Sequence, residues 1–98
     1  MSKASDKVNS QELYRAILSL ESEDECRRFF KDLCTIAELR AMEQRYDVAV
    51  LLDRGLVYSD ILERTGASSA TISRVNKALN YGEEGYKDVL RHMREQDS

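Results

Sequence analysis

Proline is absent from the 98 residues of this sequence, and glycine occurs only four times. Proline interrupts a helix because it lacks a backbone N–H and its ring clashes with the preceding turn. A chain without proline has few forced breaks, and helix is the structure that benefits most. No stretch alternates between apolar and polar residues as a half-buried strand does. We therefore expect an all-α protein.

Long apolar runs are also lacking. No segment approaches the roughly 20 apolar residues that are needed to cross a bilayer. Residues 1–7 have no apolar core of the kind found in a signal peptide. We therefore expect a cytoplasmic protein that does not enter the membrane. The chain is 42% hydrophobic and 34% charged, which is the composition of a globular protein.

Residues that bind metals or perform catalysis are few. Cys26 and Cys34 are eight positions apart, which is not a metal-ligand spacing, and the single histidine, His92, is far from them. We expect the cysteines to be small core residues in a reducing compartment. No phosphate loop, cofactor fingerprint or converging set of titratable groups is present. We therefore expect no enzyme activity, no metal and no cofactor.

Apolar residues recur at helical spacing along most of the chain, which predicts six helices. A capping residue followed by glutamate three positions later marks three of the helix starts: Asn9 with Glu12, Ser22 with Glu25, and Thr35 with Glu38. The predicted helices cover about residues 10–20, 23–33, 36–54, 59–65, 69–79 and 84–93. We expect flexible tails over residues 1–8 and 94–98, and one helical domain over residues 9–93.

The helix predicted over residues 36–54 is apolar on more than one face near its C-terminal end, at Ala49, Val50, Leu51 and Leu52. A helix of this kind must be buried from several sides. A chain of this length has a core of only modest size. A second subunit can supply the missing cover, so we expect a homodimer.

Residues 58–79 carry the pattern of a helix-turn-helix. Gly66 stands where two short helices would meet in a tight turn, which favours the left-handed backbone that glycine adopts without strain. Such a unit needs small or branched apolar groups on its inside. These are supplied by Ile61, Ala67, Ile72, Val75 and Leu79. The spacing therefore predicts two helices packed at a steep angle, with Ser68 or Ser69 capping the second.

The opposite face of this second helix is suited to double-stranded DNA. The residues that we expect to contact DNA are Arg64, Ser68, Ser69, Ala70, Thr71, Ser73, Arg74 and Lys77. Small side chains allow close approach to the major groove, hydroxyls can bond to base edges, and cations can bind phosphates. The net charge is −3, but residues 64–82 contain no acid. The alternative, which the negative charge favours, is a helical dimeric protein-interaction module that does not bind DNA.

Residues 66–74, with the sequence GASSATISR, resemble the turn and recognition-helix start of the Trp repressor superfamily, and more narrowly of its YerC/YecD-type members. The likeness extends back over residues 35–55, and the helix lengths fit over most of the chain. The resemblance implies six helices, an intertwined homodimer and a transcriptional regulator, most simply a repressor, with two recognition helices one DNA turn apart. It places Ser69, Ala70 and Ser73 at base-reading positions and Thr71 on phosphate.

The resemblance also implies a site for a small-molecule corepressor. Thr35, Arg45 and Arg74 stand at the positions with which Trp repressor holds its ligand. Where the repressor has a glycine beneath the indole and a serine further along, this chain has Val75 and Ala78, which add bulk and remove a hydroxyl. These differences argue against tryptophan as the ligand, and the sequence alone identifies no other effector. From the residues alone, Thr35 can equally be a helix cap, and the arginines can form ion pairs or contact phosphate.

Overall fold

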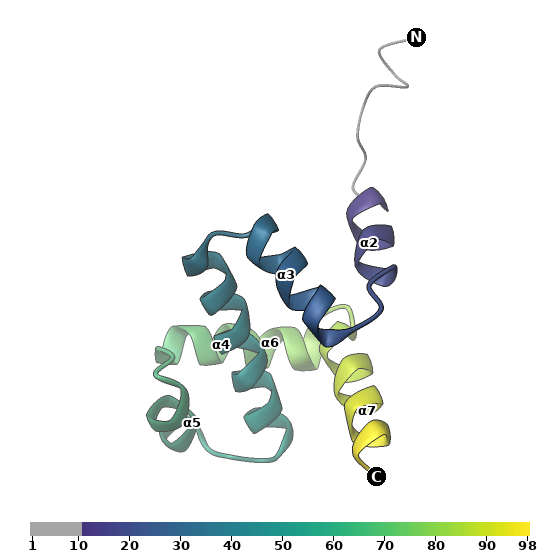
Figure 1. Cartoon of the computed structure of the whole chain (residues 1–98). Coiled ribbons are helices and arrows are strands. Elements are labelled where there is room, and N and C mark those ends of the chain that lie inside the picture. The colour runs from purple at the N-terminus through teal and green to yellow at the C-terminus, as the bar shows by residue number, and fades with distance from the viewer. Residues whose placement is uncertain (1–10) are drawn as a thin grey trace, which may run out of the picture. The chain divides into compact units, whose positions relative to one another are not determined.

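The computed structural model describes residues 11–98, and every regular element in this part of the chain is a helix. The helices are α2 (Gln11–Leu18), α3 (Glu23–Leu33), α4 (Ile36–Asp53), α5 (Tyr58–Thr65), α6 (Ser69–Tyr81) and α7 (Gly85–Asp97) (Figure 1). The predicted all-α fold class is confirmed. The predicted cap Asn9 and the predicted tail over residues 1–8 lie outside the described residues.

The chain divides into two compact units, and the boundary between Leu39 and Arg40 falls within α4. The first unit contains α2, α3 and the start of α4, and the second contains the rest of α4 with α5, α6 and α7. No helix within residues 11–98 is long and apolar enough to cross a membrane. The single helical domain over residues 9–93 stays a prediction.

In the first unit, side-chain caps determine where the helices begin. The Ser22 hydroxyl accepts a hydrogen bond of 3.0 Å from the backbone N–H of Glu25 at the start of α3. At the start of α4 the predicted capping box is complete: the Glu38 N–H donates to Thr35 Oγ1 (3.1 Å), and the Thr35 N–H donates to the Glu38 carboxylate (2.9 Å). These bonds, the one from the Thr35 backbone first, hold the pKa of Glu38 below its ordinary value.

The apolar stripes of the first unit are only partly covered in the single chain. Phe29 and Phe30 are half-buried and pack edge to face, with 5.5 Å between ring centroids. Leu18 is 84% exposed, and Ile36, the first residue of α4, is 73% exposed. Burying an apolar side chain of this size contributes roughly 1.5–3 kcal/mol. The first unit therefore leaves much of its apolar surface in contact with water.

The core of the second unit joins α4, α5 and α6. Its buried members are Val48 and Ala49 of α4, Ile61 of α5, Ala67 of the turn, and Ile72 and Val75 of α6. Leu51, Leu52, Leu56 and Tyr86 are partly buried against this cluster. Leu79 is also buried, so all five apolar residues predicted for the inside of the helix-turn-helix are in the interior. The prediction of its packing face is confirmed.

Two helices extend further than predicted. α6 continues past Leu79 to Tyr81 and ends at Gly82, where an added Cβ would meet the carbonyl oxygen of Ala78. α7 continues past Met93 to Asp97, and the Arg94 guanidinium in its last turns donates to the Asp53 carboxylate of α4 (2.7 Å). Residues 94–97 are helical, so α7 ends later than the predicted end near residue 93, and the flexibility of residues 94–98 stays a prediction.

Candidate nucleic-acid interface

Gly66 closes the turn between α5 and α6. It ends α5 in the left-handed conformation, with φ 72° and ψ 5°, and its N–H donates to the carbonyl of Leu62 at 2.8 Å. A Cβ added at Gly66 would meet no atom within 4 Å. The requirement for glycine therefore comes from the backbone angle alone. The turn predicted at this residue is confirmed.

Thr65 and Gln44 attach this turn to α4. The Thr65 hydroxyl donates to the Ile61 carbonyl (2.7 Å) and accepts from the N–H of Ala67 (3.1 Å). The Gln44 side-chain amide donates to the Thr65 carbonyl (3.2 Å). Together with the burial of Ala67, these bonds hold the start of α6 in place, as precise recognition requires. Sequence reasoning missed Gln44, because its bond to Thr65 spans 21 positions and has no local signature.

Ser68 is the cap of α6. Its backbone is extended (φ −69°, ψ 158°), and its hydroxyl oxygen accepts from the Thr71 N–H at 3.1 Å. The Ser68 and Thr71 hydroxyls also bond to each other at 3.1 Å. The first N–H groups of a helix have no acceptor inside it. Ser68 accepts the bond from the Thr71 N–H, so the N–H groups of Ser69 and Ala70 are the ones that have no acceptor inside the helix. N–H groups in this position can bind a phosphate.

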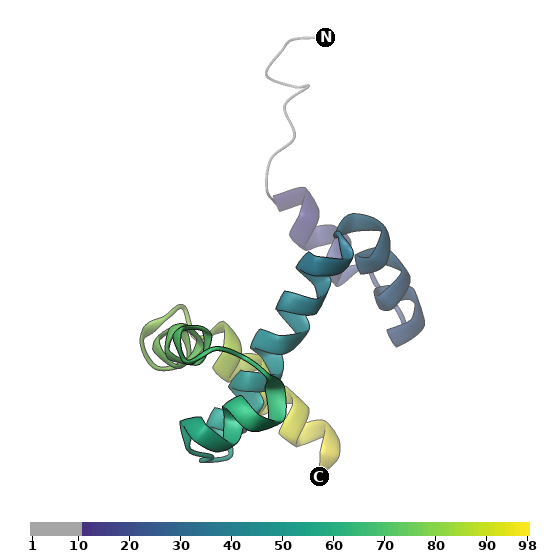
Figure 2. The ribbon, with the colours of Figure 1, turned by 90° about the vertical axis from the view of Figure 1, so that its left-hand side faces the viewer.

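The two faces of α6 differ sharply in exposure. Ile72, Val75 and Leu79 are buried, which clamps one face to the core. On the other face the side chains are open to solvent, and Figure 2, in which α6 is seen nearly end-on, shows it at the edge of this unit. The exposed residues predicted to contact DNA are Ser69, Ala70, Ser73, Arg74 and Lys77, while Thr71 is half-buried. A rigid helix thus presents a small, polar and basic surface.

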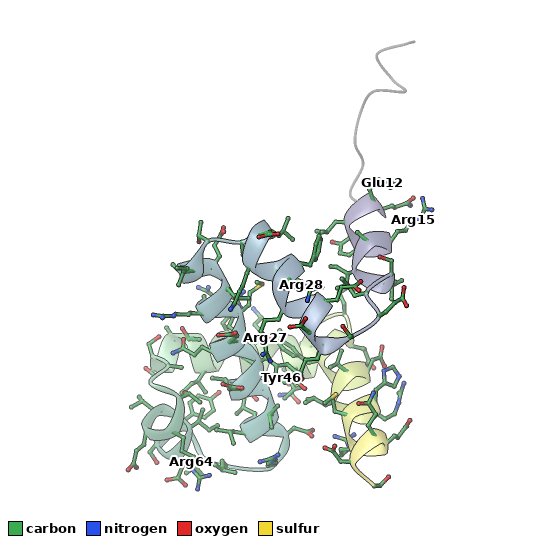
Figure 3. The ribbon with its side chains drawn as sticks, in the orientation of Figure 1. Glu12, Arg15, Arg27, Arg28, Tyr46 and Arg64 are labelled. Carbon is green, nitrogen blue, oxygen red and sulfur yellow. The ribbon has the colours of Figure 1, made fainter. Side chains whose placement is uncertain are left out.

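The cations of this surface are free to bind phosphate. Arg64, which projects from α5 (Figure 3), Arg74 and Lys77 have no ion-pair partner within residues 11–98. By contrast, Arg27 and Arg28 of α3 pair with carboxylates one turn away. A surface whose cations are unpaired attracts an anionic polymer more strongly than one whose charges cancel locally.

The three residues at the corepressor positions fall in different units. Thr35 belongs to the first unit, where it caps α4, whereas Arg45 and Arg74 belong to the second. Arg45 is half-buried and Arg74 is exposed. Val75 is 2% exposed and packs in the core, so its side chain is directed inward. A corepressor site at Thr35, Arg45 and Arg74 stays a prediction.

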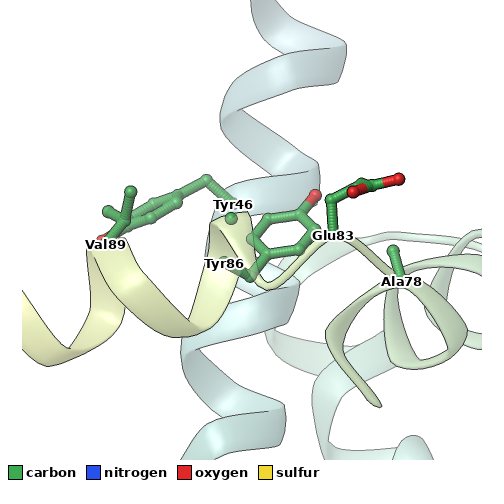
Figure 4. Close-up of a pocket in the computed structure, with 6 residues that line it drawn as sticks. Tyr46, Ala78, Glu83, Tyr86 and Val89 are labelled. Atoms are coloured by element: carbon green, nitrogen blue, oxygen red, sulfur yellow. The ribbon is translucent and has the colours of Figure 1, made fainter. Parts of the chain in front are cut away.

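An apolar pocket of about 470 Å³ lies between α4, α6 and α7 (Figure 4). It is lined by Tyr46, Ala78, Glu83, Gly85, Tyr86 and Val89. The lining contains one carboxylate and two phenols but no cation. Neither Arg45 nor Arg74 is part of it.

The remaining candidate chemistry is sparse. No group of three or more potential metal ligands occurs within residues 11–98. Cys26 and Cys34 are free thiols and half-buried. His92 lies on the exposed surface of α7, where its ring contacts the Arg91 side chain at 3.3 Å.

The family model for Trp repressor protein matches residues 9–94 of this chain. The chain belongs to the Trp repressor family. It is similar to protein YerC of Bacillus subtilis, with 46% identity over 96 residues that cover 95% of this chain and 92% of YerC. Members of the Trp repressor family are DNA-binding regulators rather than enzymes. Membership of this family supports the general function of a DNA-binding regulator for this chain.

Two solved structures show the same fold. A TrpR-like protein from Eubacterium eligens is 51% identical, with a TM-score of 0.82 over 85% of this chain and 86% of that one. A Trp repressor candidate from Staphylococcus aureus is 38% identical, with a TM-score of 0.84 over 96% of each chain. The predicted family is therefore confirmed, and residues 11–98 contain six helices.

Proposed function

We propose that this chain is a sequence-specific transcriptional repressor that reads the major groove of DNA with the first turns of α6. The asymmetry of α6 carries the proposal. Its inner face is buried in the core, its outer face is exposed, and residues 64–82 contain no acid that would repel phosphate. A helix of this kind fits the major groove of B-DNA, which is about 12 Å wide.

The exposed residues divide into two roles. Ser69, Ala70 and Ser73 lie in the first turns, where short side chains reach base edges and discriminate between them. The cations, together with the capping pair at the helix start, position the protein on the sugar–phosphate backbone. The positioning residues are Arg64, Ser68, Thr71, Arg74 and Lys77.

The active form is proposed to be a homodimer with its two copies of α6 one DNA turn, about 34 Å, apart. Support comes from the apolar side chains that the first unit leaves uncovered, among them Leu18 (84% exposed), Ile36 (73%) and Tyr14 (62%). Equilibrium sedimentation at micromolar concentration is expected to give twice the mass of the chain. A monomer at that concentration would contradict the two-half-site arrangement.

Lys77→Ala and Ser73→Ala separate positioning from reading. We expect Lys77→Ala to weaken binding to all duplexes alike and to lower the salt slope of the binding constant by about 1, because one cation no longer displaces counterions. We expect Ser73→Ala to cost on the order of 1 kcal/mol on the preferred site and to relax base discrimination there. Because a neutral hydroxyl displaces no counterions, Ser73→Ala should leave non-specific binding nearly intact.

The preferred site is first selected from random duplexes, and fluorescence anisotropy then measures affinity over a salt series. Lys87→Ala is the matched control, since Lys87 is exposed on α7 outside the proposed interface. Each variant must keep the circular dichroism and sedimentation of the parent. If folded Lys77→Ala and Arg74→Ala bind every duplex as well as the parent, the proposed DNA-binding function fails. The alternative, a protein-interaction module, would then be supported.

A further inference from the structure

The outer face of α6 continues beyond the residues assigned above. Because the helix runs to Tyr81, helical spacing places Ala70, Arg74, Lys77 and Tyr81 within an arc of about 60° on one face. Tyr81 is 85% exposed, which is the largest exposed fraction among the large hydrophobic side chains of the described residues. This tyrosine therefore shares the surface on which Arg74 and Lys77 stand.

The fold makes little use of this tyrosine. Tyr81 is not part of the core cluster, and no hydrogen bond of its hydroxyl occurs within residues 11–98. Its neighbour Asn80 bonds back to the carbonyl and side chain of Asn76, both at 2.9 Å, on a different flank of the helix. The phenol of Tyr81 is thus available to a partner in solution.

The length of α6 indicates what that partner is. A helix of 13 residues is about 20 Å long, whereas the major groove is about 12 Å wide. If the first turns lie within the groove, the last turns lie over the phosphates at its edge. Side chains of a helix lean toward its N-terminus, which carries the Tyr81 hydroxyl back toward that edge.

We propose that Lys77 and Tyr81 bind one backbone phosphate together at the edge of the groove. The two residues are four positions apart, so their side chains are neighbours on the helix surface. The Lys77 ammonium supplies charge, and the Tyr81 hydroxyl donates a hydrogen bond to a phosphate oxygen, a contact that tyrosine commonly makes with DNA. This inference rests on the proposed DNA-binding function.

A double-mutant cycle of Lys77→Ala and Tyr81→Phe tests the shared phosphate. Tyr81→Phe keeps the ring and is expected to weaken binding to specific and random duplexes alike by about tenfold or more, since a single hydrogen bond to a charged group is lost. The salt slope should stay unchanged, because the hydroxyl is neutral. In the Lys77→Ala background the same change should cost less than about twofold, since the phosphate is no longer held beside the ring.

Lys87→Ala is again the control, because Lys87 is exposed on α7 outside the proposed interface and its loss should leave DNA binding like that of the parent. The inference is overturned if Tyr81→Phe binds like the parent, or if the two losses simply multiply in the double variant. It is also overturned if Tyr81→Phe changes the sedimentation mass, because the phenol would then contact a second copy. In each case the proposed function still stands if Lys77→Ala weakens DNA binding. The proposed function fails as well only if Lys77→Ala and Arg74→Ala both bind DNA like the parent.

Discussion

Replacing Gly66 by alanine tests how strongly the helix-turn-helix depends on one backbone conformation. The residue has φ 72°, and an added Cβ would meet no atom within 4 Å, so the substitution introduces no clash. The cost is then the strain of holding an L-residue in the left-handed region, about 1–2 kcal/mol. Asparagine visits this region more readily, so Gly66→Asn should lose less stability than Gly66→Ala.

Gly82 provides the contrasting case. Its φ of −90° is open to any residue, but a Cβ there would meet the Ala78 carbonyl oxygen. Steric conflict does not depend on which side chain follows the Cβ, so Gly82→Asn should be no better than Gly82→Ala. Asparagine is therefore expected to rescue stability at Gly66 only.

The assay is urea unfolding of the four variants, followed by far-ultraviolet circular dichroism at one protein concentration, because a dimer's stability depends on concentration. The free energy of unfolding is compared with that of the parent. Equal losses for alanine and asparagine at Gly66, or no loss for alanine, would refute the argument from backbone angle. A rescue by asparagine at Gly82 would refute the steric argument.

Three further predictions follow from single contacts. The pKa of Glu38 is lowered by its bonds with Thr35, so the ionised Glu38 stabilises the fold above its ordinary pKa, and this stability is lost as pH falls through the lowered value. In urea unfolding over a pH series, the difference in the free energy of unfolding between the parent and Glu38→Gln should therefore shrink as pH falls over that range. Arg94→Ala removes an exposed ion pair with Asp53 and should cost about 0.2–1 kcal/mol, with faster amide exchange in residues 94–97; unchanged exchange would contradict the anchoring role. Since Val75 replaces the glycine beneath the indole in Trp repressor, calorimetry with millimolar L-tryptophan should show no binding, and saturable heat would reverse this view.

Local signals explain why much of the fold was predictable. The Thr35–Glu38 capping box, the turn at Gly66 and the buried stripe of Ile72 and Val75 each depend on residues within a few positions of one another. Short-range spacing determines which backbone groups a side chain can cap and which face of a helix is apolar. The same spacing identified the outer face of α6, on which the proposed interface stands.

Tertiary structure decided what depends on residues distant in sequence. Arg94 of α7 bonds to Asp53 across 41 positions, and the bond between Gln44 and Thr65 attaches the turn to α4. Neither contact leaves a periodic trace in the sequence, because helical spacing records only which face is buried and not what covers it.

The end of α6 shows the same division within one helix. Helical periodicity was sufficient to identify its exposed face, but the sequence did not predict its last two residues, Asn80 and Tyr81, which precede the cap at Gly82. The sequence alone was sufficient to predict the helices, the turn at Gly66 and the polar, basic character of the exposed face of α6. The three-dimensional packing decided where the helices stop and which distant side chains hold them, because those outcomes depend on distances that the chain acquires only on folding.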